Sequence, residues 1–153
     1  MQRVTNCVFF KDGKVLMLRK PSRGFWALPG GKMEPKETVK EAVVREYLEE
    51  TGIRIKDPVL KSISTFLVDE GNGVHEWMMF TFLAKDGEGQ TKETTDEGIL
   101  QWQPVQEIGN LPMAEGDRFI IRHALNGNEI MYNSFHYSSD YRLLSYRLDP
   151  ELA

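Results

Sequence analysis

Three glutamates, Glu46, Glu49 and Glu50, are the residues whose types and spacing most clearly indicate chemistry. At intervals of three and four residues they share one face of a helix, and Ala42 continues that face as an apolar row. Neighbouring like charges cost about 0.2–0.5 kcal/mol per pair on an exposed helix, and more when partly buried, so a positive partner is expected. Carboxylate oxygens suit a hard cation such as Mg²⁺ or Mn²⁺. The alternative is a solvated acidic face, which most Glu-rich helices present.

A helix of about three to four turns must carry these glutamates. Thr38 and Glu41, three residues apart, match the capping box that begins a helix, and Gly52 matches the glycine that ends one. Gly30 and Gly31 lie just upstream, where bare backbone can approach a phosphate or a metal. The glycine loop beside the acidic helix favours the metal site over the solvated face.

The spacing of these residues resembles the Nudix box, the signature of hydrolases that cleave nucleoside diphosphates linked to another group. Its specified positions are filled in order by Gly31, Glu37, Arg45, Glu46, Glu49, Glu50, Gly52 and Ile53. The one departure is Tyr47, on the packing side of the helix, where the family usually has an aliphatic residue. The resemblance implies an α/β fold, the Nudix α/β/α sandwich, with a mixed central sheet and a C-terminal β-hairpin.

The likeness to MutT-type members of the family, and to their Bacillus-like branch in particular, extends over nearly the whole chain. It is carried by residues 25–32, the strand around Trp102, the loop before Arg118 and the closing hairpin. MutT-type enzymes hydrolyse oxidised purine nucleoside triphosphates such as 8-oxo-dGTP to the monophosphate and pyrophosphate. The resemblance therefore implies an 8-oxo-dGTP diphosphatase that uses Mg²⁺, with Mn²⁺ as a substitute, in nucleotide-pool sanitation and DNA repair.

The resemblance also implies residue roles by position. The metal ligands would be the Gly30 carbonyl oxygen and the carboxylates of Glu46, Glu49, Glu50 and Glu97, the last from a distal loop. The catalytic residues would be Glu37, Arg45, Glu46, Glu49 and Glu97. Arg45 and Glu37 would orient the glutamates. Either Glu46 or Glu97 would take the proton of a water aligned for in-line attack, and the sequence leaves both open.

Six residues are the candidates for substrate binding. Lys20 and Lys32 are the cations that would meet the polyphosphate, unless they are solvated surface charges. Relatives read the oxidised base with an Asn near the Gly-Gly loop or in a later loop, but this chain has Ala27 at the first of those positions. The remaining candidates are Trp26, for stacking, and three residues before Arg118, namely Met113, Glu115 and Asp117. Trp26 could equally be core, and the two acids could equally cap the following helix.

Length and composition set broader limits. With 153 residues, 41% of them apolar and 27% charged, the chain is expected to form a single domain over residues 1–153. A net charge of −4 and a pI of about 5.4 argue against a nucleic-acid polymer as partner, because a phosphate backbone requires a basic surface. The expected partner is a small nucleotide, and the expected state is a monomer or weak homodimer.

The sequence favours a cytoplasmic protein. Cys7 is the only cysteine, so no intrachain disulfide can form and a reducing compartment is expected. The N-terminal residues do not match a signal peptide, and no apolar run approaches the roughly 18 residues of a membrane span.

Strand and helix signals alternate along the chain. The expected strands are residues 4–10 and 15–18, joined by a tight turn at Asp12-Gly13, then 53–55, 59–68, 74–84, 99–104, 130–137 and 141–148. Besides the box helix, residues 118–125 and one turn at 105–108 are expected to be helical. Residues 20–32, 86–97 and 111–117 are expected to be loops, and residues 70–73 a four-residue connection. These elements give a mixed sheet with helices on both faces.

Two other functions stay open. With the same chemistry, the substrate could be another nucleoside triphosphate, a dinucleoside polyphosphate or ADP-ribose. From a different class, the chain could be a Nudix domain that senses a nucleotide without catalysis. The intact box argues against a sensor, which has no need for every glutamate.

Overall fold

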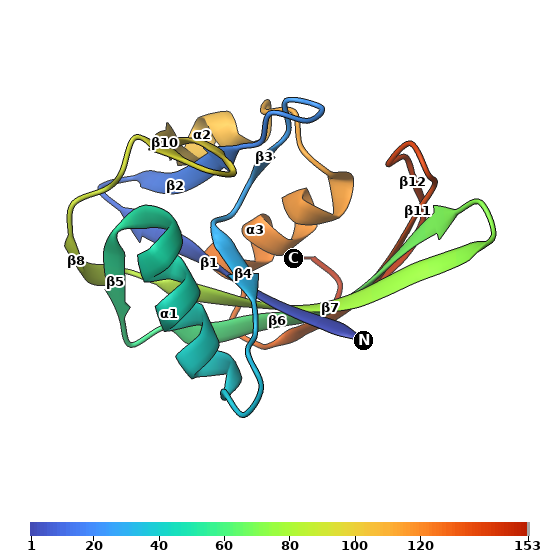
Figure 1. Cartoon of the computed structure of the whole chain (residues 1–153), viewed down its shortest axis with the longest axis horizontal. Helices are drawn as coiled ribbons and strands as arrows, with labels where there is room; N and C mark the ends of the chain where they lie inside the picture. Colours follow the sequence, from blue (N-terminus) through green and yellow to red (C-terminus); the bar gives the residue numbers. More distant parts are fainter. Residues whose placement is uncertain (153) are drawn as a thin grey trace.

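The structure, a computed structural model, describes residues 1–152 and has one large mixed sheet with helices on its two faces (Figure 1). The elements in chain order are β1 (Gln2–Lys11), β2 (Lys14–Arg19), β3 (Trp26–Ala27), β4 (Gly30–Lys32), α1 (Val39–Thr51), β5 (Ile53–Lys56), β6 (Val59–Glu70), β7 (Gly73–Ala84), β8 (Asp86–Gly89), β9 (Thr94–Thr95), β10 (Gly98–Pro104), α2 (Val105–Ile108), α3 (Glu115–Asn126), β11 (Met131–Tyr137) and β12 (Leu143–Asp149).

The box helix is α1, and its predicted caps are confirmed. The Thr38 hydroxyl accepts a hydrogen bond from the Glu41 N–H, and the Glu41 carboxylate accepts one from the Thr38 N–H. Gly52 ends the helix in the left-handed region, at φ 86°. Because these signals are local in sequence, both helix ends were predictable without tertiary information.

The large sheet has the strand order β12-β11-β6-β7-β1-β2-β10-β9. Two of its pairings are parallel, β1 with β7 and β11 with β6, and the others are antiparallel. A separate small sheet pairs β5 with β8. This arrangement confirms the predicted mixed sheet and C-terminal hairpin.

The sheet opens between β1 and β2. The two strands pair only beside their turn, at Phe10 with Val15 and Lys11 with Lys14. Further along, the same edge of β1 pairs with β4 instead, and β2 pairs with β3, so the two strands diverge (Figure 1). The divergence places the Gly30-Gly31 backbone between β1 and the glutamates of α1.

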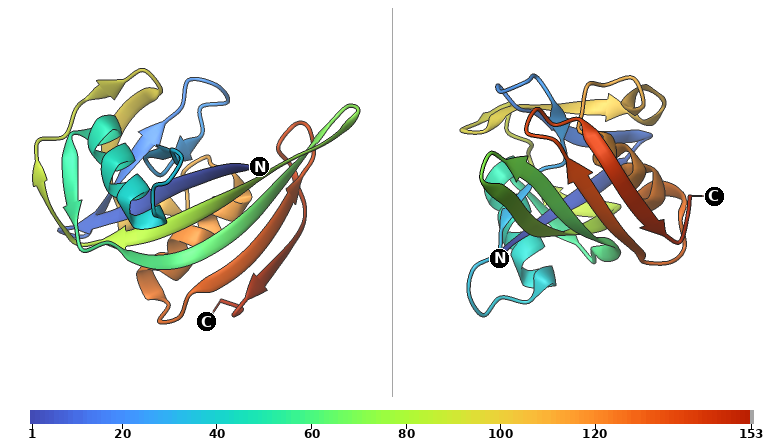
Figure 2. Two further views of the ribbon diagram at one scale, coloured as in Figure 1. Left: turned by 60° about the horizontal axis from the view of Figure 1, so that its bottom comes forward. Right: turned by 90° about the vertical axis from the view of Figure 1, so that its right-hand side faces the viewer.

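Helices α1 and α3 cover opposite faces of the sheet around β1 (Figure 2). Cys7 and Phe9 belong to the core cluster beneath α1, whereas Val8 belongs to the cluster that contains α3 residues. All three side chains are at most 2% exposed. The continuous apolar run of β1 therefore reflects burial on both faces, as expected.

Four expectations about loops were wrong. Residues 20–32 contain β3 and β4, and residues 86–97 contain β8 and β9, short strands that need a partner from elsewhere in the chain. The β6–β7 connection has two residues rather than four, because the strands extend to Glu70 and Gly73. Helix α3 begins at Glu115, so Glu115 and Asp117 lie in its first turn rather than in a loop.

The departure from the box at Tyr47 predicts a measurable effect on stability. Tyr47 is fully buried, packs edge-on against Phe9 at 6.1 Å, and its hydroxyl has no hydrogen-bond partner among the described residues. Burial of an unpaired hydroxyl costs free energy, so Tyr47→Phe is expected to raise the free energy of unfolding by about 1 kcal/mol in urea denaturation.

Tyr137→Phe is the matched control. The Tyr137 hydroxyl is also buried but accepts a 2.7 Å hydrogen bond from the Gly116 N–H, so this variant is expected to lose about 1 kcal/mol. A loss of stability in both variants would show that Tyr47 has a polar partner in solution.

Candidate active site

The two glycines before α1 lie where there is no room for a side chain. Gly30 and Gly31 pair with Asn6 and Thr5 of β1. A Cβ at Gly30 would overlap the Thr5 carbonyl oxygen, and a Cβ at Gly31 would overlap the Glu46 carboxylate. The carboxylate of Glu46 therefore lies directly against bare backbone, which brings α1 and β4 into contact.

Arg45 donates hydrogen bonds to several acidic side chains on and near α1. Its Nε and Nη2 donate to the two oxygens of Glu37 at 2.7 and 2.9 Å, while its Nη1 donates to Glu46 at 2.9 Å and to Glu49 at 3.2 Å. Nη2 also donates to the Lys32 carbonyl oxygen at 3.1 Å. The hydrogen bonds from Arg45 lower the pKa of Glu37 to about 2. Glu37 thus fixes Arg45, and Arg45 fixes the two glutamates.

Glu50 and Glu97 form the second part of the acidic site. Burial raises the pKa of Glu50, a hydrogen bond from Thr95 opposes this, and repulsion from Glu97 and Glu46 adds to it. Glu97 comes from the segment between β9 and β10, 47 positions further along the chain (97 − 50). The fold therefore brings together the helical and distal carboxylates that the sequence had linked only through a resemblance.

The donor set fits a hard divalent cation. Within residues 1–152, no three His, Cys, Asp or Glu side chains converge closely enough to hold a metal ion as they stand. Arg45 supplies positive charge to Glu46 and Glu49, whereas Glu50 has a raised pKa and two acidic neighbours. Oxygen donors carrying uncompensated negative charge match the ligand preference of Mg²⁺ and Mn²⁺.

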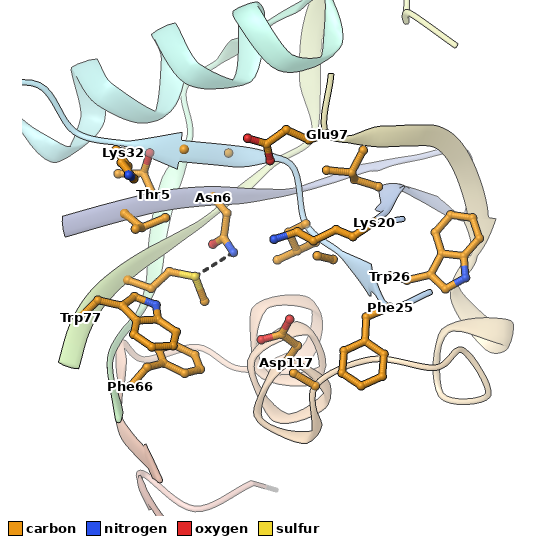
Figure 3. A pocket seen from close by; sticks show the side chains of 18 of the residues that line it. Thr5, Asn6, Lys20, Phe25, Trp26, Lys32, Phe66, Trp77, Glu97 and Asp117 are labelled. Atoms are coloured by element: carbon orange, nitrogen blue, oxygen red, sulfur yellow. Dashed lines mark hydrogen bonds between the residues drawn. The ribbon is translucent and has the colours of Figure 1, made fainter. Parts of the chain in front are cut away.

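A cavity of about 570 Å³ lies beside this acidic group (Figure 3). Glu46, Glu97 and the Gly30-Gly31 backbone line one side, and the side chains of Lys20 and Asp117 point into the cavity. Many of the other lining residues are apolar or aromatic, including Phe25, Phe66, Trp77, Met79 and Tyr137. A cavity of this size with a few convergent polar groups is suited to a nucleotide-sized ligand.

The predicted substrate residues divide into two groups. Lys20, Lys32, Trp26 and Asp117 line the cavity, although Trp26 is only 9% exposed and its indole points away from the centre (Figure 3). Met113 is 4% exposed and packs in the core cluster that contains Trp26. Glu115 is exposed and pairs with Arg118 at 3.2 Å. The prediction that Met113 and Glu115 bind substrate is therefore corrected: Met113 lies in the core, Glu115 lies on the surface, and neither lines the cavity.

Sequence reasoning missed the cavity residues carried by long strands. Asn6 is 6% exposed, accepts a 2.6 Å hydrogen bond from Thr81 and donates to the sulfur of Met79. Trp77 and Phe66 stack at 5.2 Å on the far side of the cavity from Glu97. The sequence predicts only that these residues lie in strands, because their place in the cavity depends on which strands pair and in which register.

Asp117 lines the cavity and has a displaced pKa. Burial raises its pKa to about 6, and the nearby Lys20 acts in the opposite direction. Glu115, two residues before it, forms its ion pair on the outside of α3. The rotation of α3 therefore leaves Asp117 as the acid of this turn that faces the cavity.

The raised pKa of Asp117 predicts how stability depends on pH. Below its unfolded pKa of about 3.9 the group is protonated in both states and costs nothing. Between that pH and about 6 the unfolded state ionises while the native state stays protonated, so the native state loses stability over this range and no further above it. Asp117→Asn is thus expected to be more stable than the wild type by about 1 kcal/mol at pH 7.5 and by nothing near pH 3.5. Glu115→Gln is the control in urea titrations; a pH-independent gain for Asp117→Asn would contradict the assignment.

The chain belongs to the Nudix family. The NUDIX domain model matches residues 1–124, which confirms the interpretation of the box. The chain is 51% identical over 152 residues to an uncharacterized Nudix hydrolase, YvcI, of Bacillus subtilis (strain 168), covering 99% of this chain and 96% of that protein. It superposes on the crystal structure of a mutator MutT protein from Bacillus halodurans with a TM-score of 0.94 at 50% identity, covering 99% of this chain and 100% of the other, which confirms the fold.

A third relative carries a substrate in its name. The 8-oxo-dGDP phosphatase NUDT18 of Mus musculus is 40% identical over 109 residues, which is 66% of this chain but 32% of NUDT18. Nudix hydrolases cleave phosphoric anhydrides of small-molecule nucleotides and generally use divalent metals. No helix among residues 1–152 is both long and apolar enough to cross a membrane.

Proposed function

We propose that this protein is a Mg²⁺-dependent pyrophosphohydrolase that cleaves oxidised purine nucleoside triphosphates, such as 8-oxo-dGTP, to the monophosphate and pyrophosphate. The observation that carries the proposal is a single cavity with three kinds of lining. Glu46 and Glu97 lie on one side, Lys20 and Lys32 supply positive charge, and aromatic residues form much of the remainder. These linings suit a metal, a polyphosphate and a base, respectively.

The residues that would hold the cation are Glu46, Glu49, Glu50, Glu97 and the Gly30 carbonyl oxygen. When bound, the divalent ion supplies charge neutralisation for the phosphate oxygens and lowers the pKa of a water. Arg45 keeps Glu46 and Glu49 in place through the hydrogen bonds already described, and Glu37 keeps Arg45 in place. Lys20 and Lys32 would contact the outer phosphate oxygens. Glu46 or Glu97 would take the proton of the attacking water.

The base would occupy the part of the cavity lined by Trp77 and Asp117. Trp77 is half-buried and stacked on Phe66, so its ring is held rigidly for contact with a base. An 8-oxo purine carries an N7–H donor that guanine lacks, and the Asp117 carboxylate can accept from it. The name of one relative, the 8-oxo-dGDP phosphatase NUDT18, supports an oxidised guanine nucleotide.

The deciding experiment is a product panel. Loss of substrate and the products formed with Mg²⁺ are measured by chromatography for 8-oxo-dGTP, 8-oxo-dGDP, dGTP, the other nucleoside triphosphates, a dinucleoside polyphosphate and ADP-ribose. The proposal expects the highest kcat/KM for 8-oxo-dGTP. A higher value for any unmodified nucleotide would keep the Nudix chemistry and reject the oxidised-purine substrate. No turnover of any member, with nucleotide binding retained, would indicate a sensor.

The position of water attack is a separate prediction. If α1 and the Gly30-Gly31 backbone hold the inner phosphates beside Glu46, water attacks the β-phosphorus. Hydrolysis in ¹⁸O-labelled water is then expected to place the label in pyrophosphate and leave the monophosphate unlabelled, as read by mass spectrometry. Label in the monophosphate would instead mean attack at the α-phosphorus.

A further inference from the structure

The segment that carries Glu97 is tied to the C-terminal end of α1. The Lys92 N–H donates to the Thr51 carbonyl oxygen at 2.9 Å, and the Lys92 ammonium donates to the Glu49 carbonyl oxygen at 2.8 Å. Gly52 packs so closely against the Gln90 carbonyl oxygen that a Cβ would not fit comfortably, at 2.5 Å. These contacts fix where the segment leaves α1 but involve none of the glutamate carboxylates.

Thr95 makes the contact that reaches a carboxylate. Its hydroxyl donates to Glu50 Oε1 at 3.0 Å and accepts from the Glu97 N–H, also at 3.0 Å. A hydroxyl has one proton and two lone pairs, so these two bonds use it as donor and as acceptor at once. Thr95 is half-buried, which shields both bonds from competing water.

The like charges of Glu50 and Glu97 oppose the approach of the two halves of the site. Glu50 and Glu97 repel each other, and Glu97 is exposed and carries no ion pair among the described residues. Without a restraint, repulsion would favour conformations in which the Glu97 segment swings away from α1. The Thr95 hydroxyl opposes this by fixing the Glu97 backbone and the Glu50 carboxylate to a common atom.

We propose that Thr95 is a positioning residue that joins the helical and the distal halves of the acidic site, so that Glu50 and Glu97 can act on the same divalent ion. The proposal rests on the proposed function. Thr95 itself is not a ligand; it acts through Glu50 and Glu97, whose placement it sets. Residues of this kind typically contribute ten- to hundredfold to metal affinity or activity.

Three variants test the role of Thr95. Thr95→Val keeps the shape and removes both hydrogen bonds, Thr95→Ser keeps the hydroxyl, and Thr94→Val makes the same change at the exposed neighbouring residue. Mn²⁺ binding to the nucleotide-free protein is measured from the electron paramagnetic resonance signal of free Mn²⁺. Thr95→Val is expected to raise the Kd for Mn²⁺ by roughly ten- to hundredfold, whereas Thr95→Ser and Thr94→Val leave it within about twofold.

Amide exchange gives a readout that a general loss of stability would not produce. In the metal-free protein, Thr95→Val is expected to speed exchange of the Glu97 N–H, while the amides of buried β1 residues such as Val8 exchange as in the wild type. Thr95→Ser is expected to restore slow exchange of Glu97. Should Thr95→Val fail to fold, Thr95→Ala takes its place, since it removes the same hydroxyl without adding a branched side chain.

The outcomes separate this inference from the proposed function. If the wild type hydrolyses nucleotides with Mg²⁺ but Thr95→Val binds Mn²⁺ like the wild type, the role of Thr95 is wrong and the proposed function stands. Uniformly faster exchange across β1 would also overturn it, since Thr95 would then be merely structural. If the wild type neither binds Mn²⁺ nor hydrolyses any nucleotide, both fail together.

Discussion

Replacing Glu50 by Gln is expected to lower kcat/KM for 8-oxo-dGTP by at least about a hundredfold, the upper end of what changes around a metal site usually cost. Glutamine keeps the shape of the side chain and can still accept the hydrogen bond from Thr95, so the change removes charge and little else. Burial and two acidic neighbours raise the pKa of Glu50, so in the proposed site a bound cation would offset the cost of its charge.

The same replacement is expected to lower activity but to raise the stability of the metal-free protein. Without metal, Glu50→Gln relieves the burial of a charge and its repulsion by Glu97 and Glu46, so the free energy of unfolding is expected to rise by roughly 0.5–1 kcal/mol. In saturating Mg²⁺ the order reverses, because only the wild type gains ligand stabilisation. Thermal unfolding with and without excess chelator measures both.

Glu41→Gln is the matched control for Glu50→Gln. Glu41 lies on the same helix, is exposed, and its role in the capping box survives replacement by Gln. Its kcat/KM and response to Mg²⁺ are expected to match those of the wild type. Full turnover by Glu50→Gln, or by the wild type in excess chelator, would refute the metal site.

Removing the Asp117 carboxylate is expected to erode the preference for 8-oxo-dGTP over dGTP by about ten- to hundredfold. The physical reason is the N7–H donor of the oxidised base, which would be left buried and unpaired at a cost of about 1–3 kcal/mol. Asp117→Ala is the test, with kcat/KM measured for both nucleotides. Dependence on Mg²⁺ is expected to be unchanged, because Asp117 belongs to α3 and not to the acidic group on α1.

Glu115→Ala provides the control for this selectivity. Glu115 sits two residues earlier on α3 but pairs with Arg118 outside the cavity, so its removal is expected to leave the ratio of kcat/KM values unchanged. A wild-type ratio in Asp117→Ala would mean that another group reads the base. A lost preference in Glu115→Ala but not in Asp117→Ala would contradict the observed rotation of α3.

The local features of this protein can be predicted from its sequence alone. Thr38 with Glu41, and Gly52, set the two ends of α1, and Asp12-Gly13, both at positive φ, set the first hairpin turn. Helix periodicity also placed Glu46, Glu49 and Glu50 on one face, because side-chain direction in a helix follows from residue spacing alone. The Nudix fold and family followed from the same short stretch.

Which side chains face the cavity depends on how the strands and helices pack together. Asn6 meets Thr81 because β1 pairs with β7 in one register, and Trp77 reaches the cavity through the same pairing. A shift of one residue would turn these side chains to the other face, and the sequence of one strand does not specify its partner's register. Asp117 and Glu115 differ for a related reason: the packing of α3 against the sheet sets its rotation, which turns one acid inward and leaves the other in solvent.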